Sequence, residues 1–291
     1  MNQFSIAQLA QFSGIKPHTI RIWEQRYGAL TPNRSEGNTR YYDNNQLRRL
    51  LNLVSLSATG HKIAKLSPLS DKELFKLVEA QKEISQSAVN ELFISQILAA
   101  GIEYNEALFE KIFSHCILKF GLKDTYLEII YPSLVRLGLL WSTGNLPPAQ
   151  EHFLSNLYRQ KLLTAIDSLP VAAEKQDSWL LFSREDEFHE MGLLFAHYLL
   201  KSAGKKVIYL GTNVPLTSIS DCVSVTKVEN ALFFLVRNEN VDEVNDYIDK
   251  LQKELRGKRI VVATNEKLAP QLAKRKKTEV IHSVDELLNI L

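Results

Sequence analysis

The sequence of 291 residues is poor in cysteine, in long apolar runs and in net charge. Its two cysteines, Cys116 and Cys222, lie far apart and form no pairing motif, which excludes a cysteine metal site and favours a reducing cytoplasm. No apolar run approaches the length needed to cross a membrane, and the first residues do not begin a signal peptide. The sequence therefore predicts a cytoplasmic protein with no membrane partner.

The sequence also lacks the common patterns of catalysis. It contains no nucleophile–base pair, no Gly-rich loop that could cradle a phosphate and no zinc-ligand spacing. These absences predict that the protein is not an enzyme.

Positive charge is concentrated at the N-terminal end of an almost neutral chain. The whole sequence carries a net charge of +2, whereas residues 1–60 contain seven Lys or Arg against three Asp or Glu, a local net charge of +4. The remaining residues therefore carry −2. A basic end on a nearly neutral chain is typical of a nucleic-acid-binding head.

The first thirty residues have the pattern of a helix-turn-helix. Ser5 and Gln8 form a capping box that begins a short helix, and Gly14 provides a turn. Pro17 then begins a second helix at its preferred first position. Three apolar residues with helical spacing are predicted to face inward from this second helix: Ile20, Trp23 and Tyr27.

A hairpin is predicted at residues 33–42, with its turn at Gly37-Asn38, and a further helix begins after Asp43. Arg and Tyr side chains of such a hairpin can reach DNA phosphates. The candidate DNA-binding residues lie on the outer face of the second helix and on the hairpin: His18, Thr19, Arg21, Gln25, Arg26, Arg34, Arg40 and Tyr41.

This stretch closely resembles the DNA-binding head of the MerR family. The segment from Thr19 to Gly28 and the later Arg40-Tyr41-Tyr42 match the family's signature almost position for position. The resemblance implies that Arg21 and its neighbours lie in the major groove of a double-stranded DNA operator, and that the wing around Arg40 grips the backbone. It also implies a homo-oligomer, a dimer or a tetramer, on a pseudo-palindromic site.

Behind the head, Pro68 and its flanking serines mark a boundary, and residues 71–168 have the periodicity of helices. Asn105 is expected to cap a segment that ends at Gly121, and Pro147-Pro148 introduce the last helix. Four helices with short loops predict a bundle.

The C-terminal part begins with a strand–helix–strand unit. Residues 179–182 and 206–210 are apolar enough for buried strands, and a helix-period segment between them stops at Gly204. Such a unit has parallel strands and a right-handed crossover. His189 comes just after the first strand, where open α/β sheets bind ligands. Judged on its neighbours alone, His189 is as well explained by packing at a helix start as by metal binding.

The segment from Glu187 to Gly192 resembles the first motif of the cobalamin-binding domain, which is acidic-x-His-x-x-Gly. In that family the His coordinates cobalt and the acidic residue holds its ring, so the resemblance makes His189 the metal ligand, with Glu187 and Gly192 beside it. Later apolar segments predict five strands in all, a flavodoxin-like doubly wound parallel sheet.

A second constellation lies in the predicted bundle, where Trp141 precedes Glu151-His152 with nine residues between. This spacing resembles the helical domain of the CarH/LitR-type photoreceptor regulators. In that family the Trp covers the adenosyl face of the cofactor, and the Glu and His line the same cavity. The resemblance therefore adds Trp141, Glu151 and His152 to the cofactor-binding residues and makes adenosylcobalamin the expected cofactor.

Two positions depart from the cobalamin pattern. The family has a Ser-containing motif after the third strand and paired glycines after the fourth, whereas this sequence has Leu235-Val236-Arg237-Asn238 and Ala263-Thr264-Asn265. Photoreceptor members also follow the Trp with a cobalt-capturing His, where this chain has Ser142. A hydroxyl is a poor substitute for imidazole as a cobalt ligand, so a light response in the family's form is not expected.

The sequence thus predicts three domains: a winged helix-turn-helix head at 1–70, a helical bundle at 71–170 and a cobalamin-binding-like α/β domain at 176–291. The predicted function is that of a sequence-specific DNA-binding regulator, a repressor, with a cobalamin-type sensor. One alternative is the same regulator with a cobalamin-independent C-terminal part that serves oligomerisation or another ligand. The other is a cobalamin-dependent methyltransferase module, which the DNA-binding head disfavours.

Overall fold

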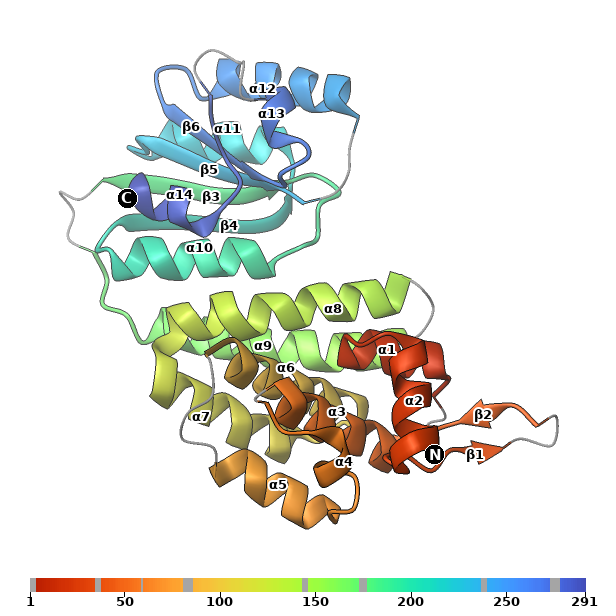
Figure 1. Cartoon of the computed structure of the whole chain (residues 1–291). Helices are drawn as coiled ribbons and strands as arrows, with labels where there is room; N and C mark the ends of the chain where they lie inside the picture. The colour runs from red at the N-terminus through yellow and green to blue at the C-terminus, as the bar shows by residue number, and fades with distance from the viewer. Residues whose placement is uncertain are drawn as a thin grey trace. The chain divides into compact units, whose positions relative to one another are not determined.

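The computed structural model describes residues 4–34, 38–58, 60–80, 86–142, 146–172, 177–236, 240–272 and 278–291. The chain divides into two compact units, Met1–Tyr158 and Arg159–Leu291, with the division inside one long helix (Figure 1). Among the described residues, no helix combines the length and the apolar character needed to span a bilayer.

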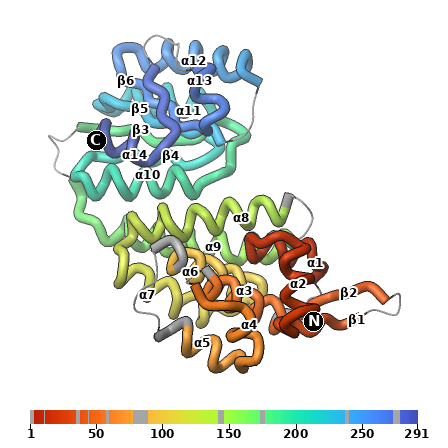
Figure 2. Tube along the Cα trace, viewed as in Figure 1, coloured from red at the N-terminus to blue at the C-terminus, as the bar shows by residue number. Residues whose placement is uncertain are grey.

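The first unit begins with two short helices, α1 (Ile6–Ser13) and α2 (Pro17–Tyr27). The predicted capping box is present, because Gln8 N donates to Ser5 Oγ and Ser5 N donates to Gln8 Oε1. A two-stranded ribbon follows, in which β1 (Asn33–Arg34) pairs antiparallel with β2 (Arg40–Tyr41). Figure 2 shows the ribbon extending beside α2. The predicted turn residue Gly37 lies outside the described residues.

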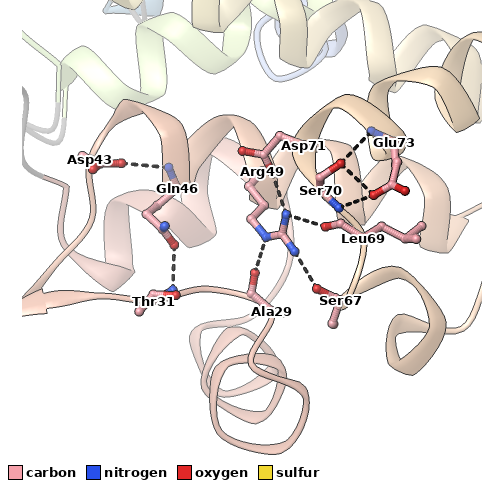
Figure 3. Close-up of polar contacts among 10 residues, drawn as sticks. All are labelled: Ala29, Thr31, Asp43, Gln46, Arg49, Ser67, Leu69, Ser70, Asp71 and Glu73. Atoms are coloured by element: carbon pink, nitrogen blue, oxygen red, sulfur yellow. Dashed lines mark hydrogen bonds and ion pairs between the residues drawn. The ribbon is translucent and has the colours of Figure 1, made fainter.

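The head continues through α3 (Asn44–Ala58), α4 (Ile63–Leu66) and α5 (Asp71–Ala80). Arg49 of α3 links the ends of three segments, because its guanidinium donates to the carbonyls of Ala29, Ser67 and Leu69 and to Asp71 Oδ1 (Figure 3). This side chain therefore stabilises the head from within.

The helices behind the head are α6 (Gln86–Ile102), α7 (Glu106–Thr125), a π-helical turn η1 (Tyr126–Ile130), α8 (Tyr131–Ser142) and α9 (Pro148–Asp167). Asn105 caps α7 as predicted, since Leu108 N donates to its Oδ1 at 3.0 Å. The predicted stop at Gly121 is a break within α7, where φ is 73°. Gln150 Nε2 of α9 donates to the carbonyl of Ile102 at 2.8 Å, which ties α9 to the end of α6.

Head and bundle share one apolar cluster. Leu53, Leu56, Ile63 and Leu74 of the head pack in it together with Leu92 of α6. This continuity explains why the chain up to Tyr158 forms a single compact unit. The boundary expected near residue 70 stays a prediction.

The second unit contains a five-stranded parallel sheet with the order β4-β3-β5-β6-β7. The strands are β3 (Ser178–Arg184), β4 (Lys206–Val214), β5 (Asn230–Leu235), β6 (Arg259–Thr264) and β7 (Glu279–Ile281). In sequence order this is 2-1-3-4-5, which confirms the predicted flavodoxin-like topology. The switch point lies between β3 and β5, so their carboxyl ends are where the fold places a ligand.

The connecting helices are α10 (Met191–Ser202), α11 (Leu216–Val225), α12 (Val241–Glu254), α13 (Ala269–Leu272) and α14 (Val284–Asn289). Alternate residues of β5 point to opposite faces. Phe233 packs in a core with residues of α11, α12 and α13, whereas Phe234 meets α10 on the other face. One prediction about this region was wrong: the second strand was expected to end at residue 210, but β4 continues to Val214 through a register shift near Gly211.

Candidate functional site

The outer face of α2 presents a row of polar and cationic side chains. His18, Arg21 and Gln25 are exposed at helical spacing, Arg26 is exposed beside them, and Thr19 is half-buried. Ile22 belongs to the same face and is 41% exposed, a feature that the sequence analysis missed although its spacing from His18 and Gln25 could have revealed it. Tyr27 was predicted to face inward, but it is 39% exposed because it occupies the last turn of the helix.

The ribbon beside α2 carries the remaining candidate DNA-binding residues. Arg34 is exposed, and its guanidinium donates to Asn38 Oδ1 at 2.5 Å. Arg40 Nε instead donates to Glu24 Oε1 of α2 at 3.1 Å, and Tyr41 is half-buried. The pairing of Arg40 was not predicted, because it joins residues sixteen apart in the sequence.

Glu24 is the residue that ties the ribbon to α2. Its second carboxylate oxygen accepts a hydrogen bond from the Tyr42 hydroxyl at 2.8 Å. Burial and the neighbouring Glu24 carboxylate raise the pKa of Tyr42 well above its usual range, so the phenol remains a donor at neutral pH. The ribbon is therefore held at a fixed angle to the outer face of α2 by a charge-assisted contact.

In the second unit, His189 follows the carboxyl end of β3 and lies against Glu187. His189 Nδ1 is 2.5 Å from Glu187 Oε1, and the same oxygen accepts the backbone N–H of His189 at 3.0 Å. The Glu187 side chain is 1% exposed, whereas the His189 side chain is 59% exposed. A carboxylate acceptor holds the ring proton on Nδ1, which makes Nε2 the atom that can coordinate a metal.

The loop that carries this pair has an unusual backbone. Asp186 and Asn213 both have positive φ, 65° and 56°, although neither is glycine. They contact each other, because Asp186 N donates to Asn213 Oδ1 at 2.9 Å, and Asn213 N donates to the carbonyl of Glu187. The end of β4 thus fixes the loop that presents His189.

Gly192 permits α10 to begin directly beside the sheet. A β-carbon at this position would lie 2.9 Å from Phe234 Cε1, which is closer than real contacts allow. On the same face, Ser183 is paired in register with Phe234, and its buried hydroxyl has no hydrogen-bond partner among the described residues. An unsatisfied buried hydroxyl is uncommon in a native fold and is explained when a ligand or water supplies the partner.

Two further His–carboxylate pairs provide a comparison with the pair at His189. His152 Nδ1 is 2.9 Å from Glu151 Oε2, and His282 Nδ1 is 3.1 Å from Glu286 Oε2. Their carboxylates are 27% and 39% exposed, so water competes for them. Of these three pairs in the described part of the chain, the one at His189 alone has a fully buried carboxylate that orients an exposed ring, which is the arrangement that metal-bound histidines use. Trp141 of α8 is 54% exposed.

Comparison with known protein families finds matches for two segments of the chain, both before the parallel sheet. Residues 4–72 match the family described as MerR HTH family regulatory protein, and residues 93–164 match the family described as B12 binding domain. One segment of the chain is thus similar to the MerR HTH regulatory proteins, and a second segment, within α6 to α9, is similar to the B12 binding domain.

Two transcriptional repressors of Myxococcus xanthus are similar to this chain over most of its length. The HTH-type transcriptional repressor CarH is 27% identical over 84% of this chain and 83% of its own, and the repressor CarA is 29% identical over 79% and 76%. A monomethylamine corrinoid protein from Methanosarcina barkeri superposes with a TM-score of 0.54 at 14% identity, covering 69% of this chain and 97% of its own. The last likeness concerns the fold alone.

The residues of this chain fit a corrinoid in one respect and differ from the cobalamin pattern in another. The His189–Glu187 pair is a suitable donor set for cobalt. At the ends of β5 and β6, however, Thr264 Oγ1 donates to the carbonyl of Leu235 at 3.1 Å, where the cobalamin pattern has small residues. Arg237 and Asn238 lie outside the described residues. Among the described residues, no cluster of three or more His, Cys, Asp or Glu could hold a metal ion.

Proposed function

We propose that this protein is a repressor whose operator affinity responds to adenosylcobalamin. The observation that carries the proposal is the His189–Glu187 pair at the switch point of the sheet, in a chain whose other end presents an exposed polar face on α2. DNA binding and a cobalamin-type sensor follow from the matched families and repressors. The adenosyl form, the oligomeric state and the roles of individual residues are our proposal.

On the DNA side, the α2 face would enter the major groove. His18, Thr19, Arg21 and Gln25 would read base edges, and the exposed Ile22 could contact a thymine methyl group. Arg26, Arg34 and Tyr41 would contact the phosphate backbone. Arg40 would act through Glu24 by holding the ribbon against α2.

On the cofactor side, His189 would coordinate the cobalt through Nε2, and Glu187 would keep the ring in the required tautomer. Gly192 would let α10 begin close to the strand ends. Trp141, Glu151 and His152 are proposed contacts of the same cofactor. When bound, adenosylcobalamin supplies a carbon–cobalt bond that light can break.

We expect a homo-oligomer on a pseudo-palindromic operator, because two copies of a helix-turn-helix read two half-sites one helical turn apart. Light scattering of the purified protein, alone and with operator DNA, measures the oligomeric state.

The proposal is tested by incubating the full chain with adenosylcobalamin in the dark, removing unbound cofactor and recording the absorption spectrum. We expect a retained corrin band with the signature of imidazole coordination. His189→Ala should lose that signature and bind more weakly, and Glu187→Gln should show a smaller change, on the order of a tenfold loss of affinity. The matched control is His282→Ala, which removes a His from a His–carboxylate pair with an exposed carboxylate.

Operator binding is measured with the same variants by electrophoretic mobility shift, with and without the cofactor. A protein that retains no corrin band but binds its operator specifically would be the cobalamin-independent regulator, and the cofactor half of the proposal would fall. An unchanged spectrum in His189→Ala would exclude His189 as the ligand.

A further inference from the structure

The first unit contains a groove of about 920 Å³ that the proposed function does not use. It lies along α6, between α5 and α7, with α3 at its edge. Its floor is mainly apolar, with the buried side chains of Leu51, Leu92, Phe93, Ala99 and Ile112 beside the buried polar Asn52 and Ser95. We call this feature the basic groove, for the charges on its rim.

The rim of the basic groove is cationic on both sides. Lys111, His115 and Lys119 follow one face of α7 at a spacing of four residues, a row about 12 Å long at 1.5 Å per residue. Lys72 and Lys76 form a similar row on α5. The four lysines and His115 are exposed, so their charged ends reach solvent while their stems border the apolar floor.

The acidic residues of the groove do not cancel this charge. Among the described residues that line it, the carboxylates are Asp71 and Glu103. Asp71 is paired with Arg49 at 2.6 Å, and Glu103 is paired with Arg48. Each carboxylate therefore has its own arginine, and the four lysines contribute a net positive potential over the apolar floor.

The apolar floor and the cationic rim together indicate which class of ligand the basic groove can bind. A hydrophilic polyanion would leave the apolar floor in contact with water, and a neutral lipid would gain nothing from the lysines. The volume lies within the range of small-molecule pockets, about 300–1,000 Å³, which occur between the helices of bundles.

We propose that the basic groove binds a single-chain anionic amphiphile, of the class of long-chain carboxylates. The alkyl chain covers the floor on α6, and the carboxylate pairs with lysines of the rim. The occupant contacts α3 and α5 together with α6 and α7, so it binds where the head joins the bundle. None of the lining residues belongs to the proposed DNA or cobalamin contacts, so the groove is a separate effector site.

The test uses the full chain and the fluorescent fatty acid cis-parinaric acid. We expect saturable binding at one site per chain, displaced by oleate and not by its neutral methyl ester. Lys111→Glu combined with Lys119→Glu should raise the Kd at least tenfold. The matched control is Lys250→Glu combined with Lys253→Glu, which makes the same charge change at exposed positions of α12.

A second variant blocks the groove without altering its charge. Gln96 is half-buried on the floor, and Gln96→Trp should abolish binding by filling the space. Circular dichroism and operator binding confirm that each variant is folded. The proposal would be overturned by equal displacement by the methyl ester or by an unchanged Kd in the double lysine variant. It would also be overturned if the protein bound only phosphatidylglycerol vesicles or an acidic amphipathic peptide.

Discussion

Arg49 contributes to the stability of the head through its hydrogen bonds, and not only to the net charge of the N-terminal segment. Its guanidinium satisfies three backbone carbonyls and one carboxylate, and its side chain is only 15% exposed. It belongs to the basic residues that give the N-terminal segment its net charge of +4, yet it points into the head. Its charge therefore contributes less to DNA attraction than that of the exposed Arg21 or Arg26.

We expect Arg49→Ala to lower the free energy of unfolding of the first unit by about 3 kcal/mol, since partly buried hydrogen bonds to a charged group are lost and their acceptors left unpaired. Arg49→Lys should recover only part of the loss, because one ammonium cannot reach all four acceptors. Urea denaturation measures both. Arg26→Ala, at an exposed site of α2, is the control and should change stability by less than about 0.5 kcal/mol. Equal losses in the two alanine variants would contradict this role.

His197 makes the free energy of unfolding of the second unit depend on pH. Burial, and secondarily the nearby Lys201, lower the pKa of His197 to about 4, and its ring stacks on Tyr209 with centroids 4.9 Å apart. The folded pKa lies below the unfolded value of about 6.5. The contribution of neutral His197 to the free energy of unfolding is therefore fully present above about pH 6.5. It declines as the pH falls toward 4, because the unfolded chain binds the proton more readily.

At pH 5 this difference amounts to roughly 2 kcal/mol relative to pH 7. His197→Phe should keep the ring contact and remove the titration, so its loss of stability between pH 7 and pH 5 should be smaller by about that amount. Chemical denaturation of both proteins at the two pH values gives the comparison. Parallel pH profiles would show that His197 does not titrate in this range.

At the scale of elements, the close approach of α10 to β5 depends on Gly192. An alanine there would push its β-carbon against the Phe234 ring. We expect Gly192→Ala to cost about 1–2 kcal/mol, because the ring must shift. Gly138→Ala on α8 is the matched control: a β-carbon at Gly138 meets nothing within 4 Å, so better helix propensity should stabilise by roughly 0.5–1 kcal/mol.

The same contact can be tested by rescue. Phe234→Leu shortens the opposing side chain, so Gly192→Ala should cost less in that background than in the natural chain. Thermal unfolding of the four proteins gives the coupling energy. Strict additivity would indicate that the steric conflict is relieved elsewhere.

Elements that begin with a local signal could be predicted from the sequence. The capping box at Ser5, the cap at Asn105 and the strands of the sheet appear where side-chain pattern and spacing placed them. Local hydrogen bonds and periodicity decide such features, and both can be read from neighbouring residues. The end of β4 could not be predicted in this way, because its continuation depends on pairing with β3 past a register shift.

The contacts of the candidate sites also divide into local ones, which the sequence predicts, and long-range ones, which it does not. His189 and Glu187 are two residues apart, so their contact is a local one that the sequence pattern indicates. The contacts of Arg40 with Glu24, and of Arg49 with Ala29 and Leu69, join residues sixteen or more apart. No local pattern encodes them, and they change the interpretation of two arginines that had been counted as free positive charge.

At the scale of the whole molecule, the charge distribution predicts how DNA binding responds to salt. Cations gather on the head, while the rest of the chain has a net charge of −2. Operator affinity should fall steeply with salt, because phosphate contacts release counterions. We expect Arg34→Ala to weaken binding to all DNA sequences and to reduce the slope of log affinity against log salt by about 1.

Arg21→Ala should act differently, by reducing the preference for operator over random DNA while leaving a similar salt slope. Fluorescence anisotropy across a salt titration separates the two effects, and Lys250→Ala on α12 serves as the control. Equal affinity of the natural protein for operator and random DNA would refute sequence-specific recognition by α2.

The apolar cluster that the head shares with α6 limits how this architecture can be recombined. A head cut off near residue 70 would leave Leu53 and Leu56 without Leu92 beside them. The head therefore depends on α6 for part of its packing, and a chimaera that joins the head to a different sensor must also include α6.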